Sequence, residues 1–491
     1  MPSLNRSALP ALGADVRPRT LPWELRPRTV HFGLGAFTRA HQSVYTEGAA
    51  AATGSGWGIA AVEPRMPAAA AALAAQDGLF SVTELRPGGP RTRVVGSVAE
   101  ALTLQGDGDR LVELLTDPEV AVVTATITEK GYYRVPGTDR LDVAHPEVAA
   151  DLAATGAAGK PTAQTVVGRI AELLAARYRA EGAPVSVVSC DNMAGNGRAL
   201  GHVVRDFVAH SGWADRDAVL EWAERSVAFP QTIVDRIVPA TTAETLERAA
   251  AALGADDAMA VAGEEYRQWV LEDVFAAERP AWETDGALVV PDIAPYQLMK
   301  LRMLNGSHSA LAYLGLAAGL DTVAAAMAGP WGEGLVRALC AEVAPTLPRA
   351  ETDPDAYADT LVARFANGAV AHQLRQIGSD GSLKVVERWL EPLRALRAQH
   401  RPTPVLELAL AAWANATRPE LRASGEQRYG TADPAAADLA RAWTADGAAG
   451  PAGAVAGLLR SVGAPDLAED AGLVAAVAER VPAVAAGRVD L

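Results

Sequence analysis

Thr29-Val-His-Phe-Gly33-Leu-Gly35-Ala-Phe-Thr38-Arg-Ala-His41 is the stretch that decides the fold of the N-terminal half of this chain. Its first five residues are predicted to form a strand, and the residues after Gly35 begin a helical run. Gly33-x-Gly35 stands at the turn between them, where glycines let the backbone approach a pyrophosphate at a helix N-terminus. Thr38 stands where a third glycine would complete the dinucleotide fingerprint. Two glycines alone indicate only a tight turn, but between a strand and a helix they favour a dinucleotide site.

The alternation of strand and helix continues after this turn. Short apolar runs rich in β-branched residues are separated by helical stretches, which is the pattern of a parallel sheet with helical crossovers. The further predicted strands cover residues 57–63, 119–126 and 184–189, and the predicted helices cover residues 66–75, 107–115 and 163–180. We therefore expect an α/β domain with a Rossmann-type parallel sheet.

The pattern changes near residue 288. Residues 287–291 form the last short apolar run, and helical periodicity then continues to the C-terminus, with residues 310–328 among the predicted helices. A chain of 491 residues is also too long for one ordinary core. We expect a Rossmann-type dinucleotide-binding domain over residues 1–288 and a mainly α-helical substrate and catalytic domain over residues 289–491.

The composition excludes several classes of protein. The net charge of −15 argues against nucleic acid as a partner, because phosphate binding needs a concentrated basic face. Only Cys190 and Cys340 are cysteines, which is typical of a reducing compartment and excludes a cysteine-rich zinc site. No secretory signal is visible, nor an apolar run of the roughly 18 residues that a membrane span needs. We expect a cytoplasmic protein that binds neither nucleic acid nor membrane.

Charged residues near the turn bear on the choice of dinucleotide. Glu63 ends the second predicted strand, where nicotinamide enzymes keep an acid for the adenosine ribose hydroxyls, and this favours NAD. Arg65 follows and could instead pair with the 2′-phosphate of NADP. Arg39 falls in the first helical turn, where it could pair with a phosphate or be a surface charge.

Lys300-Leu-Arg-Met-Leu-Asn305-Gly-Ser-His308 places an amine, an amide and an imidazole in one predicted helix. At roughly 100° per residue, Asn305 lies about 140° and His308 about 80° round from Lys300, so all three fit one flank. Such groups suit a carbonyl or alcohol oxygen; the alternative is a solvated helix face with a capping Asn. Asn192 follows a predicted strand and would be a second amide donor, although an Asn there is most often a turn former.

Five motifs follow one another along the chain. They are the turn already quoted, Thr126-Ile-Thr-Glu129-Lys-Gly131-Tyr132, Ser189-Cys-Asp191-Asn192-Met-Ala-Gly-Asn196-Gly197, Phe229-Pro230-Gln-Thr-Ile-Val-Asp235-Arg236-Ile-Val-Pro239, and Lys300-Leu-Arg-Met-Leu-Asn305-Gly-Ser-His308-Ser. In this order they resemble the polyol-specific long-chain dehydrogenases, the mannitol dehydrogenase family, over nearly the whole chain.

The resemblance implies an NAD-dependent dehydrogenase without a metal, which transfers hydride between nicotinamide and a CH–OH carbon. It implies that Lys300 is the acid/base and that Asn192 and Asn305 hold the oxygen on which charge develops. An amine with an ordinary pKa near ~10.4 is a poor base at neutral pH, so burial or dipoles must lower that value. His308 would orient the substrate or Lys300. The residues implied for cofactor binding are Gly33, Gly35, Ala36, Phe37, Arg39, Glu63, Glu129 and Asp235.

A sixth segment, His372-Gln-Leu-Arg375-Gln376-Ile-Gly-Ser-Asp380-Gly-Ser-Leu-Lys384, resembles the family's substrate-lid stretch. The resemblance implies that Gln376 and Lys384 contact substrate, together with Asn192, Lys300, Asn305 and His308. Lys384 could meet a substrate carboxylate or hydroxyl. The alternative is an exposed loop with scattered charges.

Within the family, the motifs resemble fructuronate reductases (D-mannonate oxidoreductases) more than mannitol enzymes. The expected reaction is therefore the NAD-dependent interconversion of D-fructuronate and D-mannonate. The alternative is a mannitol 2-dehydrogenase or related polyol dehydrogenase that acts on a neutral ketose. A non-catalytic dinucleotide-binding redox sensor is a third reading, which the joint presence of Lys300, Asn305, His308 and Asn192 argues against. We expect a monomer whose small-molecule partner is a sugar acid or polyol.

Overall fold

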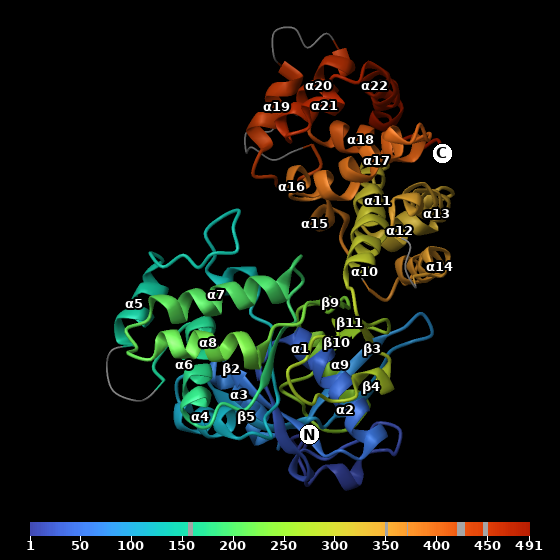
Figure 1. Cartoon of the computed structure of the whole chain (residues 1–491). Coiled ribbons are helices and arrows are strands. Elements are labelled where there is room, and N and C mark those ends of the chain that lie inside the picture. Colours follow the sequence, from blue (N-terminus) through green and yellow to red (C-terminus); the bar gives the residue numbers. More distant parts are fainter. Residues whose placement is uncertain (156–160, 349–351, 371, 420–427, 445–449) are drawn as a thin grey trace. The chain divides into compact units, whose positions relative to one another are not determined.

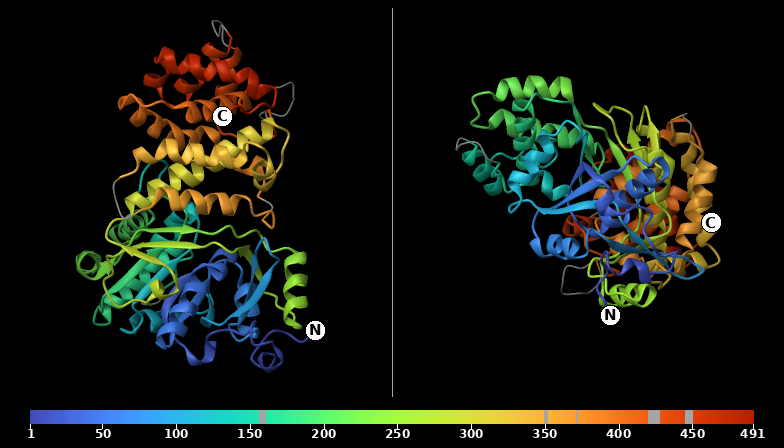
Figure 2. Two further views of the ribbon diagram at one scale, coloured as in Figure 1. Left: turned by 90° about the vertical axis from the view of Figure 1, so that its right-hand side faces the viewer. Right: turned by 90° about the horizontal axis from the view of Figure 1, so that it is seen from below.

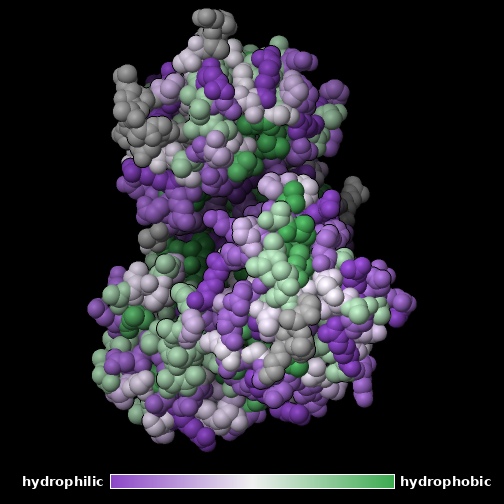
Figure 3. Space-filling view, turned by 90° about the vertical axis from the view of Figure 1, so that its left-hand side faces the viewer, coloured by the Kyte–Doolittle hydropathy of each residue, from purple (hydrophilic) through white to green (hydrophobic). Residues whose placement is uncertain are grey.

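The chain forms two compact units, Met1–Ile293 and Ala294–Leu491, each of which is described by itself. The computed structural model describes all residues except 156–160, 349–351, 371, 420–427 and 445–449 (Figure 1). The boundary expected near residue 288 lies in β12 (Leu288–Val290), the last strand of the first unit. Figure 3 shows one face of the molecule, on which hydrophilic and hydrophobic residues are interspersed.

A six-stranded parallel sheet forms the centre of the first unit. Its order is β5-β2-β1-β6-β7-β8, and every neighbouring pair is parallel. The strands are β1 (Arg26–Phe32), β2 (Trp57–Glu63), β5 (Val98–Thr103), β6 (Val122–Ala125), β7 (Val185–Ser189) and β8 (Val227–Ala228). This is the strand order of a doubly wound Rossmann sheet, so the predicted fold class of this unit is confirmed.

Side chains on the two faces of the sheet pack into two different hydrophobic cores. Val30 and Phe32 of β1 pack with α4 (Gly108–Thr116), α6 (Val166–Arg179) and α7 (Asn196–His210). On β2, Ile59 and Ala61 pack instead with α2 (Gln42–Thr53) and α3 (Pro67–Ala75) on the other face. Because both faces are covered, the central strands are mostly buried and rich in apolar residues, as expected for a parallel sheet. The strand order reverses between β1 and β6, and this switch point is where such sheets bind ligands.

Two small sheets complete the first unit, and neither was predicted from the sequence. One has the order β10-β3-β4 and the other the order β12-β11-β9. Their remaining strands are β3 (Phe80–Leu85), β4 (Arg91–Val95), β9 (Thr232–Asp235), β10 (Val261–Glu264) and β11 (Gln268–Glu272). The remaining helices of this unit include α1 (Ala36–Ala40), α5 (Pro146–Ala154), α8 (Arg216–Ser226) and α9 (Ala243–Leu253).

The described residues of the second unit form helices around one core, which confirms the predicted helical domain. Figures 1 and 2 show the helices of this unit. Leu311 and Leu314 of α11 are fully buried in its core. The main helices are α10 (Ala294–Met299), η5 (Lys300–Asn305), α11 (Gly306–Ala317), α12 (Val323–Ala328), α13 (Gly332–Val343), α14 (Pro354–Phe365), α15 (Leu374–Gly378), α16 (Gly381–Val385), η7 (Val386–Leu390), α17 (Glu391–Ala398), α18 (Pro404–Ala416), α19 (Ala436–Thr444), α20 (Gly450–Ser461), α21 (Pro465–Ala468) and α22 (Ala471–Ala485). In the described part of the chain no helix is long and apolar enough to cross a membrane.

The helix predicted over residues 310–328 is in fact two helices. Gly319 has a φ of 77°, a left-handed conformation that ends a helix readily when the residue is glycine. Thr322 then caps α12, because its side chain accepts a hydrogen bond from the Ala325 amide. A high alanine content hid this break, since alanine continues a helical pattern on both sides.

Candidate active site

The turn after β1 has the geometry that the two glycines predicted. Gly33 has a φ of 110°, and a Cβ there would lie 2.1 Å from the Thr126 carbonyl oxygen. Gly33 therefore lets β1 and the segment after β6 come together. Gly35 precedes α1 and borders a cavity, and a Cβ on it would meet no atom within 4 Å. Open space over a glycine backbone is what a pyrophosphate needs.

Thr38, at the third-glycine position, stabilises the turn through its side chain. Its hydroxyl donates to the Gly33 carbonyl at 2.9 Å and lies 2.7 Å from His31 Nε2. His31 Nδ1 lies 2.6 Å from Thr124 Oγ1 on β6. Burial lowers the pKa of His31 to about 4, so the ring is neutral at pH 7. At the position where a third glycine would complete the fingerprint, Thr38 therefore takes part in a buried hydrogen-bond network with His31.

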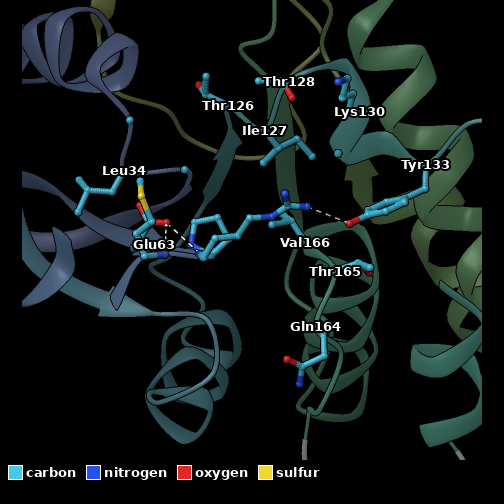
Figure 4. A pocket seen from close by; sticks show the side chains of 16 residues that line it. Leu34, Glu63, Thr126, Ile127, Thr128, Lys130, Tyr133, Gln164, Thr165 and Val166 are labelled. Carbon is cyan, nitrogen blue, oxygen red and sulfur yellow. Dashed lines mark hydrogen bonds between the residues drawn. The ribbon is translucent and has the colours of Figure 1, made fainter. Parts of the chain in front are cut away.

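A cavity of about 400 Å³ lies at the switch point of the sheet. This volume is in the range of small-molecule and cofactor pockets. Four segments line it, namely residues 33–35 after β1, 63–66 after β2, 126–133 after β6 (without residues 129 and 132) and 164–166 at the start of α6 (Figure 4). The first three were expected at the carboxyl edge of the sheet. The fourth was not predicted, although Thr165 is a recognisable N-cap whose side chain accepts from Gly168 N.

Glu63 has a fixed orientation at the rim of this cavity. Its side chain is buried, and Oε1 accepts hydrogen bonds from the amides of Arg65 and Met66 at 2.9 and 3.0 Å. Arg65 extends away from it and donates to the Tyr133 hydroxyl at 3.2 Å, the dashed contact on the right of Figure 4. A carboxylate held by two amides is preorganised to accept hydrogen bonds from a ligand.

The other predicted cofactor residues do not line the cavity. Arg39 is buried, with Nη1 donating to the Leu34 carbonyl at 3.4 Å, and burial lowers its pKa to about 10. Phe37 stacks on His41 at 4.9 Å, and its neighbour Ala36 packs against the core. Glu129 is exposed and pairs with Arg134. Asp235 ends β9. Arg39 is thus neither the surface charge considered from the sequence nor a residue of the cavity wall.

In the second unit, Lys300, Asn305 and His308 lie on one continuous helix, which is visible in Figure 1 as α10 followed by α11. Residues Lys300–Asn305 are a π-helix, not the α-helix assumed for the angular prediction. In a π-helix the hydrogen bonds join residues five apart, so Asn305 lies about one turn from Lys300 rather than ~140° round. Lys300 is 9% exposed and His308 is 7% exposed. Turns of this kind occur frequently at functional sites.

His308 is a buried, neutral imidazole. Burial, followed by the nearby charges of His372, Arg364 and Arg388, lowers its pKa well below the ordinary value. Its ring centre lies 4.2 Å from that of Phe365, with the two rings tilted by 30°, and it meets His372 edge-on at 5.0 Å. Its Nε2 is buried and has no hydrogen-bond partner among the residues that the structure describes. A buried, unpaired ring nitrogen is available to a ligand, but its low pKa makes it a weak base.

Arg388 and Trp389 of η7 hold the first turn of α11. Arg388 Nη1 donates to the Asn305 carbonyl at 3.3 Å and to Ser309 Oγ at 2.7 Å. Trp389 Nε1 donates to the Gly306 carbonyl at 3.2 Å. These contacts fix the backbone that carries Asn305 and His308. Nothing in the local sequence indicated them, because they join residues about eighty positions apart.

The two predicted lid residues differ in their surroundings. Gln376 is exposed on α15. Lys384 is half-buried, and its Nζ donates to the carbonyls of Ile377 and Ser379 at 3.2 and 2.6 Å. Burial, and then the charge of Arg388, lowers the pKa of Lys384. Lys384 therefore caps the carboxyl end of α15.

The predicted catalytic set is divided along the chain. Lys300, Asn305 and His308 belong to the second unit, and Asn192 belongs to the first, where it follows β7. Among the described residues, no group of three or more His, Cys, Asp or Glu side chains could hold a metal ion.

Comparison with known proteins adds to this geometry. Residues 27–284 match the family model of the mannitol dehydrogenase Rossmann domain, and residues 292–485 match the mannitol dehydrogenase C-terminal domain. The chain is an oxidoreductase that acts on CH–OH groups. It belongs to the mannitol dehydrogenase family, which confirms the resemblance seen in the five motifs.

Three relatives cover most of the chain. D-mannonate oxidoreductase of Escherichia coli (strain K12) is 39% identical over 402 residues, which are 80% of this chain and 80% of that protein. Mannitol 2-dehydrogenase of Cereibacter sphaeroides is 40% identical over 367 residues, 73% of this chain and 74% of that protein. The structure of Pseudomonas fluorescens mannitol 2-dehydrogenase, a ternary complex with NAD and D-mannitol, matches with a TM-score of 0.75 at 33% identity. That match covers 98% of this chain and 96% of the other. The chain is accordingly a polyol or sugar-acid dehydrogenase of this family.

Proposed function

We propose that this chain is an NAD-dependent fructuronate reductase, which interconverts D-fructuronate and D-mannonate. The observation that carries the proposal is the pair of arginines near His308, since the charges of Arg364 and Arg388 both lower its pKa. Such a surrounding suits a substrate that carries a carboxylate. A D-mannonate oxidoreductase is among the relatives of this chain, at 39% identity, so this substrate occurs within the family.

NAD is the proposed cofactor, held in the cavity beside the turn after β1. The open space over Gly35 fits a pyrophosphate, and the fixed carboxylate of Glu63 suits two ribose hydroxyls. A 2′-phosphate there would be repelled by Glu63. Arg65, the group that could favour NADP, already donates to Tyr133.

The proposed mechanism needs one acid/base and two amide donors. Lys300 gives a proton to the carbonyl oxygen during reduction and removes it during oxidation. The amides of Asn192 and Asn305 donate hydrogen bonds to that oxygen as negative charge develops on it. His308 is a weak base because its pKa is lowered, so it orients the substrate. A bound nicotinamide would supply the hydride for reduction and would accept it in oxidation.

A polyol dehydrogenase acting on a neutral ketose is the second candidate. The Cereibacter sphaeroides mannitol 2-dehydrogenase is as similar to this chain as the D-mannonate enzyme is. Substrate choice is tested by following NADH absorbance with D-fructuronate and D-fructose side by side at equal concentration. We expect the higher kcat/KM with D-fructuronate; a preference for D-fructose would favour the polyol enzyme.

Lys300→Ala separates both enzymes from a redox sensor. The substitution should abolish turnover and leave NADH binding, measured by fluorescence, nearly unchanged. Near-normal turnover would contradict the proposed acid/base. We also propose that the enzyme is a monomer, which sedimentation equilibrium can test.

A further inference from the structure

Asp191 is a buried carboxylate, 5% exposed, that follows β7 directly. Oδ1 accepts hydrogen bonds from the amides of Ile127 and Thr128 at 3.0 and 2.8 Å. Oδ2 accepts from the Tyr132 hydroxyl at 2.9 Å and lies 3.2 Å from the Ile127 amide. All of these donors belong to the segment after β6, so one side chain holds a whole stretch of the cavity wall.

The segment that Asp191 holds would not adopt its conformation unaided. Thr128 has a φ of 61° and a ψ of 161°, a region that residues with a side chain rarely occupy. Ile127 and Thr128 both line the proposed cofactor cavity. Such strain persists only where surrounding bonds over-determine it. The Asp191 carboxylate supplies those bonds.

The backbone of Asp191 is fixed in its turn, and it leads directly into Asn192. Its carbonyl accepts from the Met193 amide at 2.9 Å and from Asn196 Nδ2 at 3.0 Å. Asn196 is 1% exposed, and it also exchanges hydrogen bonds with the backbone of Thr232 on β9. The chain is therefore held on both sides of Asn192.

We infer that Asp191 is a positioning residue that couples the cofactor-facing segment Ile127–Thr128 to the substrate-facing amide Asn192. The inference rests on the proposed function, because it assigns Asn192 to the substrate oxygen. Asp191 touches neither substrate nor cofactor in this role. It sets the distance between the two walls that carry them, and errors of about 1 Å in such a distance lower rates by about 100-fold.

The test compares Asp191→Ala with Asp191→Asn. Alanine leaves the Ile127 and Thr128 amides without their acceptor, whereas asparagine keeps one oxygen that both amides can reach. We expect Asp191→Ala to lower kcat by about 10- to 100-fold while the dissociation constant of NADH rises by less than about tenfold. Asp191→Asn should restore kcat to within about fivefold of the wild type.

A kinetic isotope effect distinguishes positioning from simple loss of stability. With NADH deuterated at the transferred hydrogen, the effect on kcat should rise in Asp191→Ala, because a misaligned hydride step becomes rate-limiting. A variant that is merely less stable would lose active molecules and show the isotope effect of the wild type.

Asp257→Ala is the matched control. Asp257 is equally buried, 3% exposed, and accepts from the amides of Ser81 and Met259 at 2.6 and 2.8 Å. Neither of those residues lines the cavity. This control should lower Tm and leave kcat per folded molecule and the isotope effect unchanged. Equal kcat losses in Asp191→Ala and Asp257→Ala would overturn the inference.

Two further outcomes are decisive. If the wild type is active and Asp191→Ala has the same kcat and isotope effect, the inference is overturned and the proposed function is not. A wild type that reduces neither D-fructuronate nor D-fructose overturns the proposed function, and the inference with it.

If Asp191→Ala does not fold, Tyr132→Phe is the alternative variant, because it removes one donor to Asp191 and keeps both amides. An isotope effect raised above that of the wild type supports the inference, and an unchanged one refutes it.

Discussion

Adding one methyl group at Gly33 should destabilise the first unit strongly. The new Cβ would lie 2.1 Å from the Thr126 carbonyl oxygen, whereas ordinary contacts begin near 3.4 Å. Thr126 belongs to the backbone that hydrogen-bonds to β1, since its amide donates to the Phe32 carbonyl at 2.8 Å. The two segments would have to separate by about 1 Å in a close-packed interior.

Two terms contribute to the expected loss. A residue with a side chain at a φ of 110° costs about 1–3 kcal/mol. Overpacking adds about 1–3 kcal/mol. The free energy of unfolding should therefore fall by about 2–6 kcal/mol, a large part of the ~5–15 kcal/mol that a native protein has.

Gly35→Ala is the control for Gly33→Ala, and urea unfolding with NADH fluorescence titration is the assay for both. Gly35 has a φ of −76°, and a Cβ there meets nothing within 4 Å, so stability should change by less than about 0.5 kcal/mol. The methyl would instead occupy the space proposed for the pyrophosphate and weaken NADH binding about tenfold or more. Gly33→Ala with the stability of the wild type would refute the steric reasoning. Gly35→Ala with unchanged affinity would refute the place given to the cofactor.

Three other predictions concern the cofactor, the substrate and pH. Glu63→Gln removes the charge at the cavity rim, so the preference for NADH over NADPH should fall by about tenfold in binding titrations; an unchanged ratio would remove Glu63 from cofactor choice. Lys384→Ala should raise KM for D-fructuronate by about tenfold more than KM for D-fructose, and equal increases would exclude contact with a carboxylate. Because burial lowers the pKa of His31 to about 4 from 6.5, the unfolded chain binds the extra proton between these values. The stability contributed by the neutral His31 ring should therefore be complete above pH 6.5 and be lost as the pH drops towards 4, by roughly 3 kcal/mol. The buried His41, whose pKa is lowered to about 3, adds a slope of the same sign, so His31→Gln should reduce the slope in urea titrations without abolishing it. The same slope in the variant would show that another group titrates.

Much of the Rossmann sheet could be predicted because its signals are local. The strand Trp57–Glu63 was placed correctly from its apolar run, and the turn at Gly33 from its glycines. The small sheet of β3 and β4 was missed, although Pro87-Gly-Gly-Pro90 between them is a turn signal. β10 and β11 are only four and five residues long, too short for a clear period of two.

The candidate site was predictable residue by residue but not in its geometry. Lys300 and Asn305 were identified by their chemistry, yet neither the π-helix between them nor the hydrogen bond from Arg388 to the Asn305 carbonyl could be read from the local sequence. Arg39 was placed on a phosphate or at the surface because its sequence position gave no sign of its burial. The start of α6 was not predicted to line the cavity for the same reason, because its position there depends on tertiary packing and not on the local sequence.

The cavity of the first unit has a consequence for how such enzymes could be recombined. Its lining comes entirely from residues between positions 33 and 166, whereas Lys300, Asn305 and His308 lie beyond the boundary at Ile293. A crossover between two family members at that boundary would keep one parent's proposed cofactor cavity whole and exchange the helix that carries the proposed acid/base as a block. Chimeras of this kind should inherit coenzyme preference from the N-terminal parent, and three of the four proposed reacting-centre residues from the C-terminal parent.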